Sequence, residues 1–285
     1  MGLKSVDSFL YALLVLAAVS IVVNLVLVWV VMSVRNKSRE VRLALALAGV
    51  DIVLSILVMI NFSLKLLKVS SMAEICQIKG PLDFLLIFAS TALVSTISIE
   101  RSSVAVSKKV TTGVWVLLGI VTGTFTLLVC IEAIKKEFTI TASGLACAPI
   151  ASNSPLSAVL LFVLSSSLFI FLLMTVISYL RILILLAGWG LIDSKSNPSE
   201  QINPAARRSV MVRILSISFI YLLLLAPCSM IMLMESLKLV KAPDVASLVI
   251  SILLAIVSSV NPCIILFAHT AIYRQFCFKL TCLFG

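Results

Sequence analysis

Charged residues are scarce in this sequence: Asp, Glu, Lys and Arg make up 12% of its 285 residues, whereas a soluble domain carries about 25%. Histidine occurs once, as His269, which argues against a metal site built from imidazoles. No Gly-rich, Ser-rich or low-complexity segment divides the chain. This composition argues against a soluble enzyme, and we expect a single membrane domain over residues 1–285.

The residues that are abundant form long apolar stretches. Hydrophobic residues make up 61% of the chain, and the mean hydropathy is +1.23. A stretch of roughly 20 apolar residues can cross a bilayer, and it must be a helix because an open strand would leave backbone groups unpaired in hydrocarbon. The sequence therefore predicts an all-α bundle of seven membrane-spanning helices, at 8–33, 41–66, 74–106, 110–131, 156–187, 207–234 and 245–268. The first is too long for the apolar region of a signal peptide, so we expect it to be retained.

The basic residues are unevenly distributed between the two ends of these helices. Fourteen of the 22 Lys and Arg residues fall in 35–42, 101–109, 181–213 and 274–279, which lie on one side of the membrane. Because cytoplasmic loops carry an excess of Lys and Arg, we predict an outer N-terminus and an inner C-terminus. The net charge of +10 then belongs to the cytoplasmic face and is no argument for binding nucleic acid.

Two polar features lie inside predicted helices. Asp51 is about ten residues into the second, and a charge near the bilayer centre costs at least about 2.5–3.5 kcal/mol on insertion scales, so it should face other helices and have a partner. Such a partnership would serve either packing alone or function. Pro262, in the seventh helix, frees the backbone carbonyl of Ser258, which a neighbouring side chain or water must satisfy.

The third predicted helix carries a polar stripe. At 100° per residue, Cys76, Asp83, Ser90 and Arg101 fall within roughly 40° of one another. Glu100 precedes Arg101, so two opposite charges are adjacent at the inner end of this helix. Considered alone, these two residues are equally typical of a charged helix end that reaches the lipid headgroups.

Together these positions resemble the rhodopsin-like (class A) G-protein-coupled receptors over essentially the whole chain. The residues that match family motifs are Asn24, Leu47 to Asp51 (Leu-Ala-x-x-Asp), Arg101 (Asp-Arg-Tyr) and Asn261-Pro262 (Asn-Pro-x-x-Tyr). Cys76 stands 25 residues before Arg101, the usual interval in the family. The resemblance implies a multi-pass receptor of the plasma membrane that binds a small extracellular ligand and activates a heterotrimeric G protein.

The resemblance also implies roles for residues at the inner half of the bundle. Arg101 would gate the G-protein site, held by Glu100 at rest and released when the sixth helix swings outward. Tyr179, Asn261 and Pro262 would take part in the same rearrangement. Such a gate needs a contact with two states that differ by a few kcal/mol.

The sequence departs from the family pattern at several of these motifs. Ser102 replaces the Tyr of the Arg motif, Ile265 replaces the Tyr of the Asn-Pro motif, and Leu225 replaces the usual Trp of the sixth helix. Arg207 stands where some relatives carry an acid, so no lock between it and Arg101 is expected. The missing aromatic residues and short termini are more similar to chemosensory or divergent orphan receptors than to hormone receptors.

By the same resemblance, Cys76 and Cys147 would form a disulfide that pins an outer loop over the ligand pocket. The sequence has seven cysteines, and Cys130 is the competitor for that pairing. After the seventh helix, 270–283 is amphipathic and is predicted to lie on the inner leaflet, with Cys277 and Cys282 as candidates for palmitoylation.

The ligand site would lie in the outer half of the bundle. Asp83 occupies the place where amine receptors carry a carboxylate, so the resemblance implies a cationic ligand such as an amine. Asp83 would equally be able to pair with Lys79 or Lys65, which leaves the charge of the ligand open. The other residues expected to line this site are Ile87, Cys228 and Ser251.

A sodium ion is the one cofactor that the resemblance implies, as an allosteric ion rather than a reactant. Oxygen atoms are the ligands that a small hard cation prefers. The residues expected to hold it are Asp51, Ser90, Ser258 and Asn261.

The alternative function is that of a small secondary transporter or channel. Transporters of this kind are commonly built from inverted repeats with broken helices at matching positions in two halves. Seven is an odd number of helices, and the two prolines recognised inside them, Pro227 and Pro262, both fall in the last two. An intramembrane enzyme would need convergent catalytic groups, which the sequence does not offer.

Overall fold

The structure is a computed structural model that describes residues 3–34, 38–67, 72–106, 112–140, 147–149, 154–192, 204–239, 244–268 and 270–284. Its helices are α1 (Leu3–Met32), α2 (Arg39–Leu66), α3 (Met72–Val106), α4 (Thr112–Ile134), α5 (Pro155–Ile192), α6 (Pro204–Ser236), α7 (Asp244–Ala268) and α8 (Thr270–Phe284). Two short strands, β1 (Phe138–Ile140) and β2 (Cys147–Pro149), form an antiparallel pair between α4 and α5. The helix ends lie within five residues of the expected ones.

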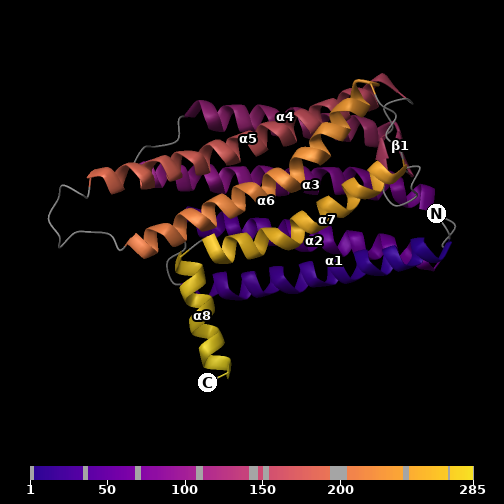
Figure 1. The fold of residues 1–285 in the computed structure, drawn as a ribbon. Coiled ribbons are helices and arrows are strands. Elements are labelled where there is room, and N and C mark those ends of the chain that lie inside the picture. The colour runs from indigo at the N-terminus through magenta and orange to yellow at the C-terminus, as the bar shows by residue number, and fades with distance from the viewer. Residues whose placement is uncertain are drawn as a thin grey trace.

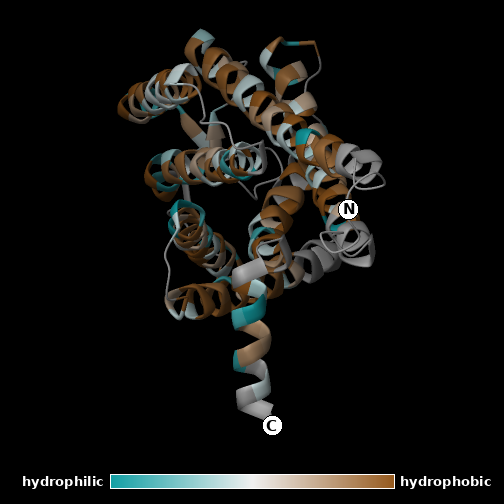
Figure 2. Cartoon of the chain, turned by 90° about the vertical axis from the view of Figure 1, so that its left-hand side faces the viewer, coloured by the Kyte–Doolittle hydropathy of each residue, from teal (hydrophilic) through white to brown (hydrophobic). Residues whose placement is uncertain are grey.

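Seven of these helices run side by side as an all-α bundle, as predicted (Figure 1). In the described part of the chain, α1 to α6 each contain a stretch long and apolar enough to cross a membrane, and α7 contributes the shorter stretch Ile252–Leu266. At 1.5 Å per residue, the 25 residues of α7 reach about 37 Å, which is also sufficient. Hydrophobic residues predominate along the helices of the bundle, here viewed from the end beside α8 (Figure 2).

The order of the helices around the bundle places α3 at its centre. α3 contacts α2, α4, α5 and α7, while α1 packs against both α2 and α7 and so closes the ring. α4 is peripheral, with three buried residues: Phe125, Val129 and Glu132. α8 leaves the bundle at a steep angle at the end opposite to β1 (Figure 1). We call the end with β1 and β2 the outer end and the end with α8 the inner end, in keeping with the predicted orientation.

Two large apolar cores fill the interior, and a small third cluster consists of Leu10, Leu13 and Phe62. The inner core joins buried residues of α1, α2, α3, α5, α6, α7 and α8 and includes Tyr179, Tyr221 and Ile265. The outer core is richer in phenylalanine: the Phe88 ring stacks on Phe125 at 4.3 Å and meets Phe171 edge-on at 5.3 Å between centroids. Aromatic pairs at these separations add about 0.5–1.5 kcal/mol each beyond the area that they bury.

The strand pair is fastened to the outer end of α3. The Cys76–Cys147 disulfide joins α3 to β2, with 5.2 Å between the Cα atoms. Gln77 Nε2 donates a hydrogen bond of 2.6 Å to the carbonyl oxygen of Phe138 in β1. Gly80 is required one turn further along α3, because any larger side chain there would overlap the Phe138 ring. The sequence analysis did not foresee these strands, but the predicted disulfide is confirmed.

The helices contain one more proline than the sequence analysis recognised. Besides Pro227 in α6 and Pro262 in α7, Pro81 lies inside α3. Prolines inside helices are therefore not confined to the last two spanning helices, and that prediction was wrong. Pro81 falls directly after Gly80, where α3 bears the strand pair, so the irregular positions of this helix are concentrated at its outer end.

Candidate functional site

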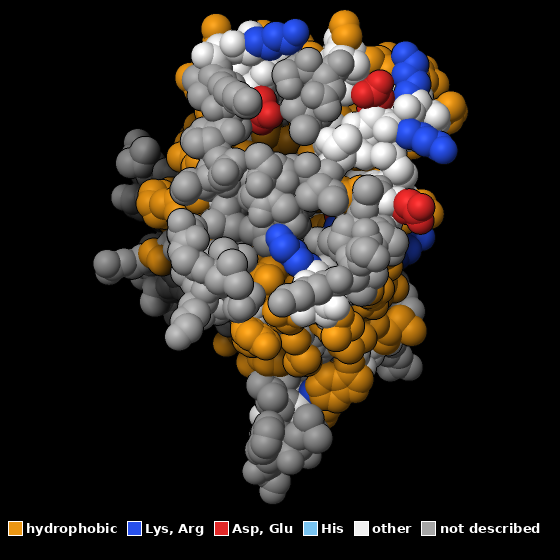
Figure 3. All heavy atoms as spheres, turned by 90° about the vertical axis from the view of Figure 1, so that its right-hand side faces the viewer, with side chains coloured by type: hydrophobic (Ala, Val, Ile, Leu, Met, Phe, Trp, Pro, Cys, Tyr) orange, Lys and Arg blue, Asp and Glu red, His pale blue; other side chains and the backbone are white. Residues whose placement is uncertain are grey.

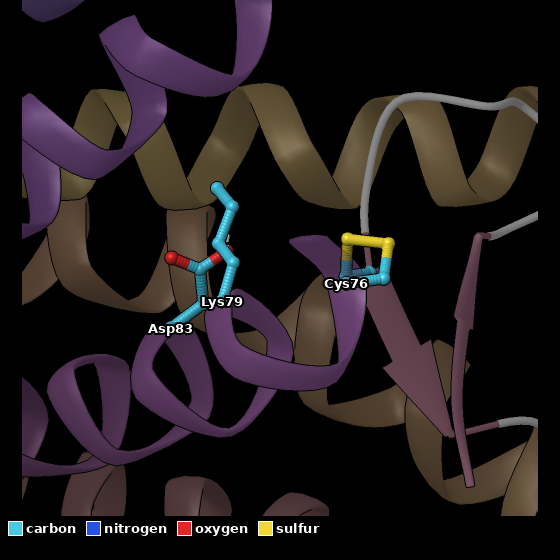
Figure 4. Close-up of polar contacts among 4 residues, drawn as sticks. Cys76, Lys79 and Asp83 are labelled. Atoms are coloured by element: carbon cyan, nitrogen blue, oxygen red, sulfur yellow. Dashed lines mark hydrogen bonds and ion pairs between the residues drawn. A yellow bond between two sulfur atoms is a disulfide. The ribbon is translucent and has the colours of Figure 1, made fainter. Parts of the chain in front are cut away.

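The outer face of the molecule carries charged side chains of both signs, mainly in the upper and right-hand parts of the view, and apolar side chains cover its lower part (Figure 3). Beneath this face, Lys79 and Asp83 are one helical turn apart on α3 and form an ion pair. Figure 4 shows the two side chains lying together on one side of α3, with Cys76 nearer the outer end and bonded to the β2 segment. Of the pairings that the sequence left open for Asp83, the structure has the one with Lys79.

The Lys79–Asp83 pair is largely removed from solvent. The exposed fraction of the side chain is 8% for Lys79 and 14% for Asp83. Asp83 Oδ2 contacts the ammonium group, whereas Asp83 Oδ1 is buried without a hydrogen-bond partner among the described residues. The carboxylate expected to bind a ligand amine is therefore already neutralised by a cation of the protein itself.

The other residues expected at the ligand site lie on three helices. Ile87, one turn deeper than Asp83 on α3, is half-buried, and Cys228 on α6 is fully buried. Ser251 belongs to α7, but its side chain lies outside the described residues. The assignment of these three to a ligand site stays a prediction.

In the middle of the bundle, four buried side chains on four helices form a hydrogen-bonded network around Asp51. Ser90 Oγ of α3 donates to Asp51 Oδ1 at 2.7 Å, and Asn261 Nδ2 of α7 donates to Asp51 Oδ2 at 2.9 Å. Asn261 Nδ2 also lies 3.1 Å from Ser90 Oγ. The hydroxyl of Tyr221 in α6 donates to Asn261 Oδ1 at 2.6 Å. We call Asp51, Ser90, Tyr221 and Asn261 the central network.

A second group of polar residues ties α1 to α7. Asn24 Nδ2 donates to the carbonyl oxygen of Ser258 at 3.2 Å, which is the acceptor that Pro262 frees one turn later. Asn24 is therefore the side chain that satisfies the Ser258 carbonyl, for which the sequence predicted a partner. Ser20 Oγ lies 3.4 Å from Ser258 Oγ and 2.8 Å from Ser55 Oγ, and Ser55 also donates to the carbonyl of Asp51. These serines connect the α1–α7 contact to the central network.

Tyr221 also borders a small cavity between α3, α5 and α6. The cavity holds about 10 Å³, roughly the room of one water molecule. Its lining residues are Thr91, Val94, Ser95, Phe171, Leu172, Thr175, Tyr221 and Leu225. Leu225, which stands where the family has Trp, leaves this space without an indole ring.

At the inner end, the expected pair between Glu100 and Arg101 is not the one that forms, and that prediction was wrong. Arg39 Nη1 lies 2.9 Å from Glu100 Oε1, and Arg101 Nε lies 3.8 Å from Glu40 Oε2. Each charge of α3 therefore pairs with an opposite charge in the first turn of α2. We call these two ion pairs the inner clamp.

The geometry of α2 and α3 explains why Glu100 and Arg101 pair with residues of α2 and not with each other. Adjacent residues on a helix point about 100° apart and do not face each other. Ser38 caps α2 by accepting a hydrogen bond from Val41 N, so Arg39 and Glu40 enter the first turn beside α3. The Arg39 guanidinium also lies 4.4 Å from the centre of the Trp115 ring of α4, which adds a cation–π contact.

The remaining residues assigned to the gate are buried in the interior. Tyr179 on α5 is 4% exposed and belongs to the inner core. Asn261 belongs to the central network, and Pro262 follows it in α7. Their part in activation stays a prediction.

α8 is held against α1 by a cation. Lys279 Nζ lies 3.7 Å from the centre of the Trp29 ring and donates to the Trp29 carbonyl at 3.3 Å. Ile272 is fully buried and Phe278 is exposed, as an amphipathic helix requires. Cys277 is a half-buried free thiol, and the side chain of Cys282 lies outside the described residues. The palmitoylation of either stays a prediction.

Comparison with known families identifies the group to which the chain is similar. Residues 23–265 match the family model of the 7 transmembrane receptor (rhodopsin family). The chain belongs to the rhodopsin family of seven-transmembrane receptors. Comparison with curated protein sequences gave no match. As a member of this family the chain is a multi-pass membrane protein and a signalling receptor.

The sequence analysis did not assign a role to several residues that form the inner clamp, the central network or their neighbouring contacts. They are Ser20, Glu40, Arg39, Ser55, Trp115 and Tyr221. Tyr221 had a detectable signal: it is a polar-tipped aromatic residue in the run Phe219-Ile-Tyr-Leu-Leu-Leu-Leu, one turn before Leu225. Buried Tyr hydroxyls usually find a hydrogen-bond partner, so this residue should have been assigned one.

Proposed function

We propose that this receptor binds a small polar ligand beneath its outer face and activates a heterotrimeric G protein at the inner end, in the plasma membrane. The observation that carries the proposal is the place of Arg101: it lies at the inner end of α3, the helix whose outer end holds the Lys79–Asp83 pair and the disulfide. One rigid element thereby spans the distance between the two sites. Whether the ligand is a chemosensory stimulus stays a prediction.

The transmission of a signal along α3 is supported by its contacts. Ser90 ties the middle of α3 to Asp51 and Asn261, and Tyr221 ties α6 to that same point. A small shift of α3 or α6 therefore has to rearrange the central network. At the inner end, partly exposed ion pairs are individually weak, so the inner clamp opens at low cost once the helices shift.

A sodium ion fits the central network, and we propose it as an allosteric ion. Asp51 is fully buried, and the two side chains that donate hydrogen bonds to its carboxylate, Ser90 and Asn261, are neutral. Asn24 Oδ1 is a buried acceptor without a partner among the described residues, close to Ser258 through the α1–α7 contact. Asp51 and Ser90, with Ser258 and Asn261, would hold the cation, which would neutralise the carboxylate.

The test of the proposed function is ligand-independent activation of G proteins. Wild-type receptor, Arg101→Ala and the matched control Arg181→Ala would be expressed in cells and compared across the main Gα classes. Arg181 is an exposed residue of α5 on the same side of the membrane. We expect basal activation by the wild type and by Arg181→Ala, and its loss in Arg101→Ala at equal surface expression. Equal activity in all three would contradict the proposed gate.

A further inference from the structure

Lys79 and Asp83 have hydrogen-bond donors and acceptors that the described residues do not satisfy. A lysine ammonium group has three donors and a carboxylate has about four acceptor positions. In the structure, one contact joins the two groups, and the remaining carboxylate oxygen, Asp83 Oδ1, is buried and unpartnered among the described residues. A buried polar atom in this condition costs about 1–3 kcal/mol, so a ligand that completes the pair gains what the unliganded protein lacks.

The charge balance of the pair decides which ligands can do this. A ligand with only a cation would place two ammonium groups on one carboxylate and leave a net positive charge in a poorly hydrated site. A ligand with only an anion would leave a net negative charge. Uncompensated charge is costly where side chains are 8% and 14% exposed. A ligand with one charge of each sign keeps the total at zero.

We propose that the site binds a zwitterionic small molecule, of the amino-acid type, with its ammonium group on Asp83 Oδ1 and its carboxylate on Lys79. This inference rests on the proposed function and replaces the simple amine with a more specific ligand class. Lys79 is one turn nearer the outer face than Asp83, a rise of about 6 Å along the helix. The ligand therefore enters with its ammonium group leading and its carboxylate toward the strand pair.

The position of the pair agrees with a ligand site rather than with a purely structural ion pair. Lys79 is flanked by Cys76, which carries the disulfide, and by Gly80, on which the Phe138 ring rests. The strand pair therefore lies against the outer end of α3, and the two charged side chains follow further along the same helix (Figure 4). Replacing a buried ion pair by neutral residues is often neutral or stabilising, so stability by itself gives little reason to keep these charges.

The first experiment measures binding to the purified full-length receptor by thermal unfolding. The probes are three sets, each made of a zwitterion, the amine that lacks its carboxylate and the acid that lacks its ammonium group. They are phenylalanine with phenethylamine and 3-phenylpropanoate, leucine with 3-methylbutylamine and 4-methylpentanoate, and 4-aminobutanoate with propylamine and butanoate. We expect at least one zwitterion to raise the Tm and to bind at least about tenfold more tightly than either of its halves. An amine that binds as tightly as its zwitterion, or no zwitterion that raises the Tm, would overturn the proposal.

Substitutions then separate recognition from folding. Lys79→Met leaves the Asp83 carboxylate alone, so this variant should bind the amine of each set more tightly than the zwitterion. Asp83→Asn leaves the Lys79 ammonium group alone, so this variant should bind the acid more tightly than the zwitterion. A purely structural pair would produce neither exchange. Because each single variant leaves a buried charge, the double variant Lys79→Met/Asp83→Asn serves as a folded reference that should have lost all binding. Retained zwitterion binding in that double variant would also overturn the proposal.

Matched controls carry the same chemical changes elsewhere on the outer end. Glu74→Gln is an exposed position on α3, and Lys135→Met is an exposed position after α4. Both should bind the probes as the wild type does. Basal G-protein activation, with Arg101→Ala as its reference, is measured in the same preparations. A receptor that activates G protein but binds no zwitterion would contradict this inference alone, whereas loss of the Arg101 effect would contradict the proposed function.

Discussion

The central network and the inner clamp both join α2 to α3, but they do so in different ways. In the central network the contacts are hydrogen bonds of 2.6–3.1 Å between fully or almost fully buried groups. In the inner clamp they are ion pairs whose side chains are 12–56% exposed. The first is strong because its loss would leave polar groups without water, and the second is weak because water can replace each partner.

This difference suits a receptor that must keep its helices together while one end opens. The helices cannot separate at the middle of the bundle without a large cost, so the central network holds them together while its own contacts rearrange. The inner end can separate at a cost within reach of a ligand's binding energy. Four predictions follow this contrast, from the largest expected change in stability to the smallest.

Asn261→Ala should produce the largest loss of stability, roughly 3 kcal/mol or more. The substitution removes the Asn261 donor of Asp51 Oδ2 and the Asn261 acceptor of the Tyr221 hydroxyl. The measurement is thermal or denaturant unfolding of the purified receptor. Ser216→Ala, an exposed serine of α6, is the control and should change stability by less than about 0.5 kcal/mol. Equal effects of the two substitutions would mean that the network does not stabilise the bundle.

Asp51→Asn should remove the response of the receptor to sodium. In the wild type we expect NaCl to stabilise the folded state relative to the same concentration of choline chloride, by about 1–2 kcal/mol if sodium is present at roughly 10–30 times its Kd. The Asn side chain has no charge to neutralise, so its unfolding should be the same in both salts. A difference that persists in Asp51→Asn would assign the sodium effect to another place.

Tyr221→Phe should lower stability by about 1 kcal/mol while it raises basal G-protein activation. The ring stays in the inner core, and the lost hydroxyl releases α6 from Asn261 Oδ1. The two readouts are Tm and ligand-independent activation in the same cells. Tyr273→Phe, on α8, removes the same atom outside the central network and should leave basal activation unchanged. A Tyr221→Phe receptor that is less stable but no more active would place the tyrosine in packing alone.

Glu40→Gln and Arg39→Gln should change stability least, by under about 1 kcal/mol each, and should raise basal activation. The cause is the release of Arg101 or Glu100 from α2. The effect on activation should shrink as ionic strength rises, because salt screens exposed pairs and has little effect on buried ones. A loss of several kcal/mol in either variant would show that the inner clamp is as strong as the central network.

Much of the bundle was predictable because lipid imposes a simple rule on the sequence. Long apolar stretches must be helices in a membrane, and Asp51 and Pro262 each required a polar partner. The partner itself was harder to predict. Ser90 and Asn261 were named from the resemblance, whereas Ser20, Ser55 and Tyr221 carry side chains that are common in helices facing lipid or protein.

The inner clamp shows where sequence proximity misleads. Glu100 and Arg101 are neighbours in the chain and carry opposite charges, so pairing them was the simplest interpretation. Their partners lie about 60 residues away, in the first turn of α2. That pairing depends on the rotation of two helices about their axes, which hydropathy and charge spacing do not contain. The strand pair escaped prediction for a related reason, since its three-residue strands are shorter than a reliable alternation pattern.

The hydrogen bond from Asn24 to the Ser258 carbonyl has a consequence for the order in which the receptor is made. A chain is synthesised from its N-terminus, so Asn24 enters the membrane while Ser258 is still to be translated. Within α1 the amide of Asn24 donates to the Ser20 carbonyl at 2.9 Å, and it gains its contact across the bundle only when α7 arrives. The contact that closes the ring between the first and the last spanning helix is therefore among the last to form during synthesis.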